Sequence, residues 1–177
     1  NAVVNLAELL LGTELSAEQR EHLTSLKSAG GHLLGLLNDI LDLSRIGTGR
    51  LLVEQRNFDL RDVLDEVGRM FTATALERGL RLRIDTDTSL PRTVNGDALR
   101  VRQVLMNLVG NAVKFTETGS ITISASVPAL GSTSVRFEVR DTGPGIAAAM
   151  QRAIFEAFVQ GDQSTARLKG GSGLGLT

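Results

Sequence analysis

The sequence contains no cysteine, tryptophan or tyrosine, and these absences exclude several kinds of site. Without cysteine the chain has no disulfide, no thiolate metal ligand and no cysteine nucleophile, and an intracellular origin is the simpler expectation. The aromatic residues are six Phe, a poor supply for base stacking, and a net charge of −1 gives no general attraction for polyanions. We therefore expect no nucleic-acid partner.

Long apolar runs are also missing. No stretch approaches the roughly 20 residues that cross a bilayer, and the N-terminus lacks the basic region and cleavage site of a signal peptide. The chain of 177 residues is nevertheless 42% hydrophobic, enough for one good core or two small ones. We expect a folded cytoplasmic piece that makes no membrane contact itself, whether or not its parent protein is membrane-anchored.

Residues 17–47 have the pattern of one long helix. Apolar residues recur every seven positions from Leu26 to Ile40, which is the spacing of a helix-bundle seam. A glycine stop at Gly12 and a Ser-x-x-Gln start at Ser16 separate this helix from a shorter one before it. We therefore predict a helical hairpin over 1–47 with an exposed leucine seam. A second copy would bury that seam, so we expect a homodimer through a four-helix bundle.

The composition changes after Gly47-Thr48-Gly49, where we place the start of a second domain, 48–177. Two late strands flank a turn at Gly131-Ser132, which indicates an antiparallel hairpin. Strands with helices on one side favour the α+β class, here a helical hairpin followed by an α/β sandwich. The predicted elements are helices at 1–11, 17–47, 60–78 and 97–115, and strands at 51–58, 80–84, 120–127 and 134–140.

The helix predicted at 97–115 carries one stripe of polar residues. At about 100° per residue, the stripe falls within about 40° of the Asn107 direction. A carboxamide oxygen is a hard, neutral ligand for Mg²⁺, and a lysine ammonium neutralises phosphate oxygens. Taken alone, a solvated helix face is the better explanation. The stripe consists of Arg100, Gln103, Asn107, Asn111 and Lys114. The predicted apolar side of the same helix consists of Val101, Leu105, Leu108 and Ala112.

A carboxylate at the end of the last predicted strand opens the hexapeptide Asp141-Thr-Gly-Pro-Gly-Ile146. Asp141 can accept a hydrogen bond from an exocyclic amine such as that of adenine. The two glycines would let a flat base approach the backbone. A plain Gly-Pro turn explains the same residues equally well.

Near the C-terminus, Gly170-Gly-Ser-Gly-Leu-Gly-Leu176 has the composition of a loop that wraps phosphates, or of a flexible linker. It is not a Walker loop, because no Gly-Lys-Ser/Thr follows, and no strand immediately precedes it as in a dinucleotide fingerprint. The preceding Phe155-Glu-Ala-Phe158 and the polar stretch 161–169 have the pattern of a lid with an apolar hinge.

Together, four segments resemble, in order and spacing, the asparagine, first glycine, phenylalanine and second glycine boxes of sensor histidine kinases. Residues 6–21 and 34–44 also resemble the dimerisation hairpin of that family, of the type often found in hybrid kinases. The resemblance covers essentially the whole chain. The four segments are Asn107-Leu-Val-Gly-Asn-Ala-Val-Lys-Phe-Thr116, Asp141–Ile146, Phe155–Phe158 and Gly170–Leu176.

The resemblance implies a Bergerat-type ATP site, shared in fold with gyrase-like and chaperone ATPases, with ATP and Mg²⁺ as cofactors. It implies transfer of the γ-phosphoryl group to a histidine on the dimerisation helix. The phosphoryl group would then pass to an aspartate of a response-regulator receiver domain, in the same polypeptide or another. Catalysis would consist mostly of positioning and charge neutralisation.

By the same resemblance, Asn107 and Lys114 would be the catalytic residues at the phosphates, and Asn111 would hold Mg²⁺. Asp141 would bind the adenine amine. The further nucleotide-binding positions that it implies are Phe115, Gly143, Gly145, Ile146, Phe158, Arg167, Gly171, Gly173, Leu174 and Gly175, the last four in the lid.

Two departures from the family pattern concern the ends of the chain. The family's phosphoacceptor lies in a His-Glu-Leu-Arg-Thr-Pro-Leu type segment that would end just before Asn1, and its second glycine box opens a helix and a final strand, whereas this chain stops at Thr177. We therefore expect a piece of a larger protein without its acceptor histidine. Neither His22 nor His32 lies in a matching segment, and we assign neither a role.

Two other functions remain open at this point. A dimeric ATP-binding scaffold would keep the fold but lack phosphoryl transfer. A gyrase-like ATPase would carry a catalytic carboxylate one helical turn before Asn111, where this chain has Asn107, and it would lack the dimerisation hairpin.

Overall fold

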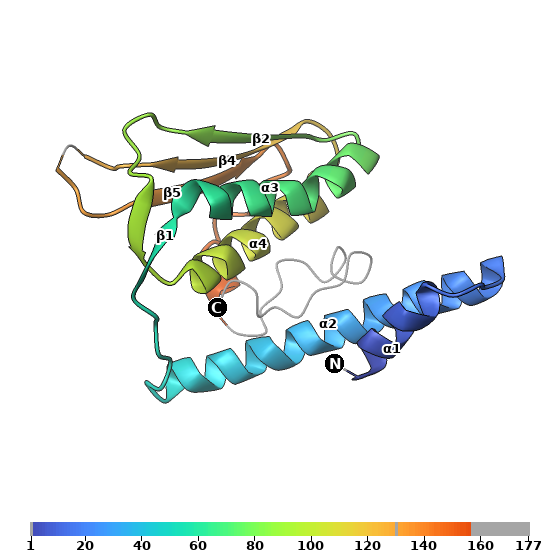
Figure 1. The fold of residues 1–177 in the computed structure, drawn as a ribbon. Helices are drawn as coiled ribbons and strands as arrows, with labels where there is room; N and C mark the ends of the chain where they lie inside the picture. Colours follow the sequence, from blue (N-terminus) through green and yellow to red (C-terminus); the bar gives the residue numbers. More distant parts are fainter. Residues whose placement is uncertain (1, 130, 157–177) are drawn as a thin grey trace.

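The computed structural model describes residues 2–129 and 131–156, apart from the side chains of His32 and Asp39. Figure 1 shows a helical hairpin beside a part in which two helices cover one face of a sheet. The predicted α+β class with an N-terminal hairpin is therefore confirmed. The helices are α1 (Ala2–Leu11), α2 (Ala17–Gly47), α3 (Leu60–Glu77), α4 (Ala98–Phe115) and the 3-10 helix η1 (Ala153–Phe155), and the strands are β1 (Arg56–Asp59), β2 (Arg81–Thr86), β3 (Thr93–Gly96), β4 (Ser120–Ser126) and β5 (Arg136–Asp141).

The long helix α2 begins at the predicted capping box. The Ser16 hydroxyl accepts a hydrogen bond from the Gln19 N–H (3.2 Å), and the Gln19 side chain accepts one from the Ser16 N–H (2.9 Å). These two bonds satisfy donors that the first helical turn leaves without partners. The sequence therefore determines locally where α2 begins.

The helices α1 and α2 run antiparallel with a defined register. Gly30 lies against Val4, since a Cβ at Gly30 would come within 2.8 Å of the Val4 Cγ2. Further toward the turn, the Lys27 ammonium donates to the Glu8 carboxylate at 2.6 Å. Successive residues of α1, taken toward its N-terminus, therefore lie beside later residues of α2.

The apolar seam of α2 is exposed in the single chain, as predicted. Leu26, Leu33 and Ile40 have 47%, 60% and 48% of their surfaces accessible. Exposed apolar residues at bundle spacing are typical of a face that another helix covers. No helix within the described ranges is long and apolar enough to cross a membrane.

The second part contains a sheet of three strands and a separate pair. In the order β2-β4-β5, β2 pairs parallel with β4, and β4 pairs antiparallel with β5. The predicted antiparallel hairpin is therefore confirmed. The pair consists of β1 and β3, antiparallel, with Arg56 opposite Gly96.

The β1–β3 pair differs from the prediction, because the strand β3 was not expected. Asn95 and Gly96 belong to β3, and the helix predicted at 97–115 follows as α4, which begins after Asp97, whose carboxylate accepts the Arg100 N–H at 3.1 Å. The predicted strand 51–58 is shorter, because only β1 finds a partner in the four residues of β3. Before β1, the Glu54 N–H donates instead to the Asp97 carboxylate at 3.1 Å.

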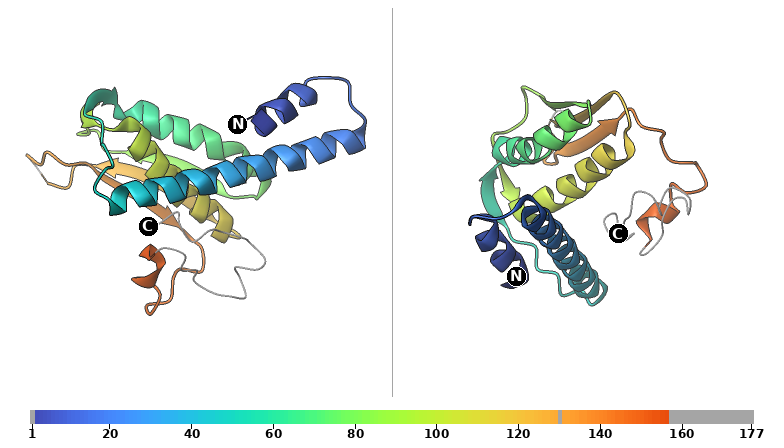
Figure 2. Two further views of the ribbon diagram at one scale, coloured as in Figure 1. Left: turned by 90° about the horizontal axis from the view of Figure 1, so that it is seen from below. Right: turned by 90° about the vertical axis from the view of Figure 1, so that its right-hand side faces the viewer.

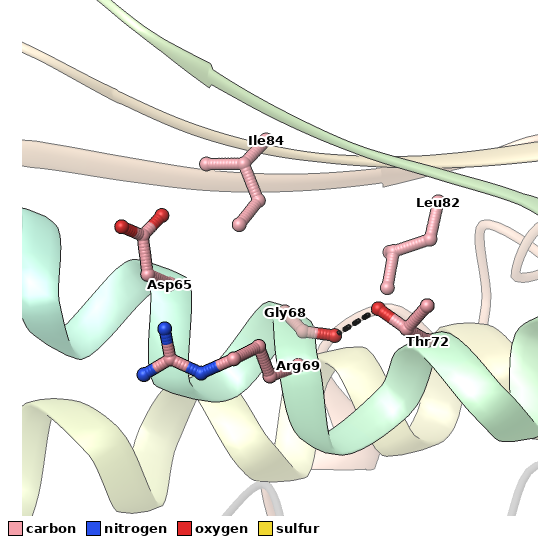
Figure 3. Close-up of a pocket in the computed structure, with 6 residues that line it drawn as sticks. All are labelled: Asp65, Gly68, Arg69, Thr72, Leu82 and Ile84. Carbon is pink, nitrogen blue, oxygen red and sulfur yellow. Dashed lines mark hydrogen bonds between the residues drawn. The ribbon is translucent and has the colours of Figure 1, made fainter.

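The core lies between α3, α4 and the three-stranded sheet. β4 is its centre, with Ile121 and Ile123 fully buried on the face toward the helices. Figure 3 shows Gly68 of α3 turned toward Ile84 of β2, and a Cβ at Gly68 would lie 3.2 Å from the Ile84 Cγ1. Glycine therefore permits the close approach of α3 to the sheet.

The buried side of α4 differs in part from the predicted one. Leu105 and Ala112 are buried as predicted, but Leu108 is only half-buried. Val109 and Val113 are buried in its place. The buried side of α4 is therefore rotated about the helix axis relative to the predicted side, since α4 packs on α3 as well as on the sheet.

Candidate nucleotide site

The polar stripe of α4 lies opposite its buried side. Asn107, Asn111 and Lys114 occupy successive turns and are half-buried. Among the described residues, the Asn111 carboxamide makes no hydrogen bond. Burial lowers the pKa of Lys114, so its ammonium would gain from an anion in the same partly desolvated place. The stripe therefore offers an unengaged amide and a poorly solvated cation.

A residue at the end of α3 hydrogen-bonds to the last turn of α4. Arg78, the C-cap residue of α3, donates from its Nη1 to the carbonyl oxygens of Val113 (2.6 Å) and Lys114 (3.4 Å). These carbonyls lack partners within the helix, and a cation is favoured at a helix C-terminus. Arg78 thus fixes the backbone that carries Lys114.

Asp141 ends β5 and starts a tight turn. Its Oδ1 accepts a hydrogen bond from the Gly143 N–H at 2.8 Å, while its Oδ2 has no partner among the described residues. A Cβ at Gly143 would lie 2.8 Å from that Oδ1, 3.3 Å from the Thr116 Oγ1 and 3.4 Å from the Phe115 carbonyl oxygen. Only glycine fits there, and its close packing brings the Asp141 turn against the end of α4.

A second contact fixes the same turn. The Thr142 hydroxyl accepts from the Ser120 N–H (3.0 Å) and donates to the Thr118 carbonyl (3.2 Å). Gly119 between them has φ +112° and faces the Thr142 side chain. The turn after α4 and the turn after β5 are therefore joined.

Substitution of Gly119 by Ala is expected to lower the free energy of unfolding by about 2 kcal/mol or more, because the new Cβ meets the Thr142 hydroxyl in an already disfavoured backbone conformation. Gly79→Ala is the matched control, since Gly79 also has positive φ (68°) but a Cβ there would meet no other described residue within 4 Å. It should cost only about 1 kcal/mol. If urea unfolding shows equal losses of unfolding free energy for the two variants, the contact between residue 119 and Thr142 does not contribute to stability.

A polar group is buried beside the Asp141 turn. Thr116 is 2% exposed, and its Oγ1 makes no hydrogen bond to any residue that the structure describes. Buried hydroxyls are almost always satisfied by protein, water or a ligand. Together with the unengaged oxygen of Asp141, this hydroxyl fits a ligand that presents hydrogen-bonding groups to the turn.

The donor set also fits Mg²⁺ bound through a nucleotide. Within the described ranges, no three His, Cys, Asp or Glu side chains lie together as a metal site. The Asn111 amide oxygen is a suitable hard ligand, and Mg²⁺ in nucleotide sites commonly takes its other ligands from phosphates and water.

The predicted positions divide into three sets. The α4 stripe leads to the end of α4, against which the Asp141 turn packs, as described above. Phe115 and Ile146 are exposed at 38% and 49%, and Gly145 has φ +72°. The predictions at Phe158, Arg167, Gly171, Gly173, Leu174 and Gly175 lie outside the described residues.

The first two residues of the predicted stripe have another partner. Arg100 and Gln103 both donate to Asp42 of α2. The sequence pattern placed them on the correct face of α4 but did not identify Asp42. No local pattern marks Arg78, Thr116 or Thr142 either, because their roles depend on contacts with distant segments.

Two family models match the two parts of the chain. Residues 96–177 match the family model described as histidine kinase-, DNA gyrase B- and HSP90-like ATPase. Residues 1–49 match the His kinase A (phospho-acceptor) domain.

Curated relatives are similar over nearly the whole chain. The signal transduction histidine-protein kinase BarA of Escherichia coli K12 is 43% identical over 99% of this chain, which spans 19% of BarA. The autoinducer 2 sensor kinase/phosphatase LuxQ of Vibrio cholerae is 39% identical over 100% of this chain and 21% of LuxQ. The chain thus spans about a fifth of the length of these relatives.

Solved structures are similar in sequence and fold. Full-length ShkA, solved with AMPPNP, is 41% identical with a TM-score of 0.76, over 98% of this chain and 35% of ShkA. The catalytic domain of histidine kinase ThkA is 31% identical with a TM-score of 0.57, over 70% of this chain and 75% of that domain. From both family models and these likenesses, the chain belongs to the sensor histidine kinases of two-component signal transduction.

Proposed function

We propose that this chain is the autokinase core of its parent protein, which binds Mg·ATP between the polar stripe of α4 and the Asp141 turn. The observation that carries the proposal is the packing of Gly143 against Thr116 and Phe115. It brings a carboxylate suited to adenine next to the end of a helix suited to phosphates. Neither feature alone favours a nucleotide, but together they match the two ends of one.

Each side chain of the site suits one part of the nucleotide. The unengaged Asp141 oxygen accepts the adenine amine, and glycine at 143 leaves room for the base. Asn107 and Lys114 orient and neutralise the phosphates, and Asn111 holds the metal ion, which supplies charge neutralisation between the phosphates. A nitrogen of the acceptor histidine, which we place on a continuation of α1 before Ala2 in the parent protein, attacks the γ-phosphorus, the bond to the β-phosphate oxygen breaks, and ADP leaves.

The partners follow from the family and from the hairpin. We infer that a second copy covers the apolar seam of α2, forming a four-helix bundle. The phosphohistidine would then donate its phosphoryl group to an aspartate of a receiver domain. Since ATP is the donor, we expect the domain to work in the cytoplasm.

The test is incorporation of labelled γ-phosphate into the full-length kinase, with the acid lability of phosphohistidine as its signature. Asn107→Ala is expected to slow labelling by about 100-fold or more, as removal of one catalytic donor generally does. Asn95→Ala is the matched control, because that exposed amide pairs with Asn57 in the β1–β3 pair and does not belong to the α4 stripe. ATP binding without any labelling of the parent protein would favour the inactive scaffold.

A further inference from the structure

A cluster of three side chains joins the hairpin to the ATP-binding part. The two guanidinium nitrogens of Arg100 donate to the two Asp42 oxygens, one of them at 3.1 Å. Gln103 donates to Asp42 at 3.1 Å and accepts from Arg100 at 2.7 Å. The Asp42 and Arg100 side chains are only 18% and 28% exposed. A forked, partly buried pair of this kind is more specific in geometry than a surface salt bridge.

The charges of this cluster support one another. The hydrogen bond from Arg100 holds the pKa of Asp42 below its ordinary value, with a smaller contribution from Gln103. Arg45, one turn later on α2, lies 4.0 Å from the same carboxylate and adds positive charge. Asp42 is therefore ionised at neutral pH and bound from two helices.

The covalent connection alone gives little reason for a fixed orientation. Between α2 and β1, Leu52 is 88% exposed and Val53 54% exposed, so this stretch packs little. Within residues 2–129 and 131–156, the Asp42 cluster links side chains of α2 and α4 by hydrogen bonds. Figures 1 and 2 show the start of α4 beside the later half of α2. The cluster therefore determines how α4 faces the hairpin.

The same stripe of α4 continues from the cluster to the proposed phosphate site. Arg100 and Gln103 are followed by Asn107, Asn111 and Lys114 in successive turns on one side of the helix. At 1.5 Å per residue, Arg100 and Lys114 are separated by about 21 Å along the axis. Contact of the first two residues with α2 places the beginning of the stripe against the hairpin.

The register of the hairpin indicates what the polar stripe of α4 would face. Because Val4 lies beside Gly30 and Glu8 beside Lys27, a helix that continued α1 past Ala2 would run along α2 toward Asp42. The proposed function assigns the acceptor histidine to that continuation. The cluster thus anchors the ATP-binding part at the level of α2 that the acceptor segment would reach.

We propose that Asp42 is a positioning residue for phosphoryl transfer: through Arg100 and Gln103 it docks the ATP-binding part on α2, with the stripe of α4 toward the acceptor segment. It touches neither nucleotide nor histidine. This inference rests on the proposed function.

The test compares Asp42→Ala, Arg100→Ala and the exchanged pair Asp42→Arg with Arg100→Asp in the full-length kinase. At saturating ATP, each single variant should label about tenfold more slowly, since misplacement of reacting groups costs one to two orders of magnitude. The KM for ATP and the Kd for ADP should change less than about twofold. The exchanged pair should recover most of the rate, and Asp65→Ala, an exposed carboxylate on α3, should not differ from the parent.

Four results would overturn the proposal, the last of them together with the proposed function. An unchanged rate would show that the cluster has no role in transfer, and faster labelling would assign it to a resting arrangement. A loss of nucleotide affinity equal to the loss of rate would indicate a merely structural role. In the 177-residue chain, small-angle scattering should show a larger radius of gyration for Asp42→Ala than for Asp65→Ala. A parent protein that binds no ATP would overturn both proposals, while the scattering would still report the docking separately.

Discussion

Asp141→Ala is expected to weaken ATP binding by roughly 100-fold while the fold persists. A hydrogen bond to a charged group contributes about 1.5–3 kcal/mol, which corresponds to a factor of about 10 to 150 in affinity. The variant also loses the 2.8 Å bond that holds the Gly143 N–H, so the turn under the base becomes less ordered. Calorimetric titration of the chain with ATP measures the change directly.

The choice of base provides a sharper readout than affinity alone. If Asp141 binds the adenine amine, the variant should lose the preference for ATP over GTP, because guanine presents an oxygen where adenine presents the amine. Glu138→Gln, on the same strand but paired with Arg140, is the control and should retain both affinity and preference. Unaltered ATP affinity in Asp141→Ala would remove the carboxylate from the site.

Asn111→Ala is expected to abolish the contribution of Mg²⁺ to nucleotide binding and to slow phosphorylation by about 100-fold or more. Its amide is half-buried on the α4 stripe, has no hydrogen-bonding partner among the described residues, and is the neutral ligand that the site offers to the metal ion. Titrations of ATP with Mg²⁺ and with EDTA should therefore differ for the parent chain and coincide for the variant.

The matched control is again Asn95→Ala, which removes an exposed amide outside the site. It should leave the difference between Mg²⁺ and EDTA unchanged. Should Asn111→Ala still bind ATP more tightly with Mg²⁺, another group holds the metal ion. The thermal unfolding of both variants, measured without nucleotide, should remain close to that of the parent chain, because neither side chain lies in the core.

Features fixed by neighbouring residues could be predicted from the sequence. The start of α2 depends on Ser16 and Gln19, and the polar stripe of α4 depends on helical spacing alone. The extent of β1 could not be predicted, because it depends on the length of β3 some forty positions away. The parallel pairing of β2 with β4 has no local marker for the same reason.

The candidate site shows the same division. The ordered segments that contain Asn111 and Asp141 indicate a nucleotide through their resemblance to a family, but the packing of the Asp141 turn on the end of α4 depends on the fit of Gly143 against Thr116. Likewise, the spacing predicted that Arg100 shares a face with Asn107. Its partner Asp42 lies 58 residues earlier, and only the fold brings the two together.

The uncovered apolar face of α2 has a consequence for how the stability of the hairpin depends on the concentration of the protein. When a face is covered only by another copy, folding and association share one equilibrium, and dilution acts on both. The core between α3, α4 and β4 is closed within one chain and has no such dependence. If a second copy covers this face, as proposed, one part of the polypeptide responds to mass action and the other does not, so the concentration of the protein would set how much of it is assembled.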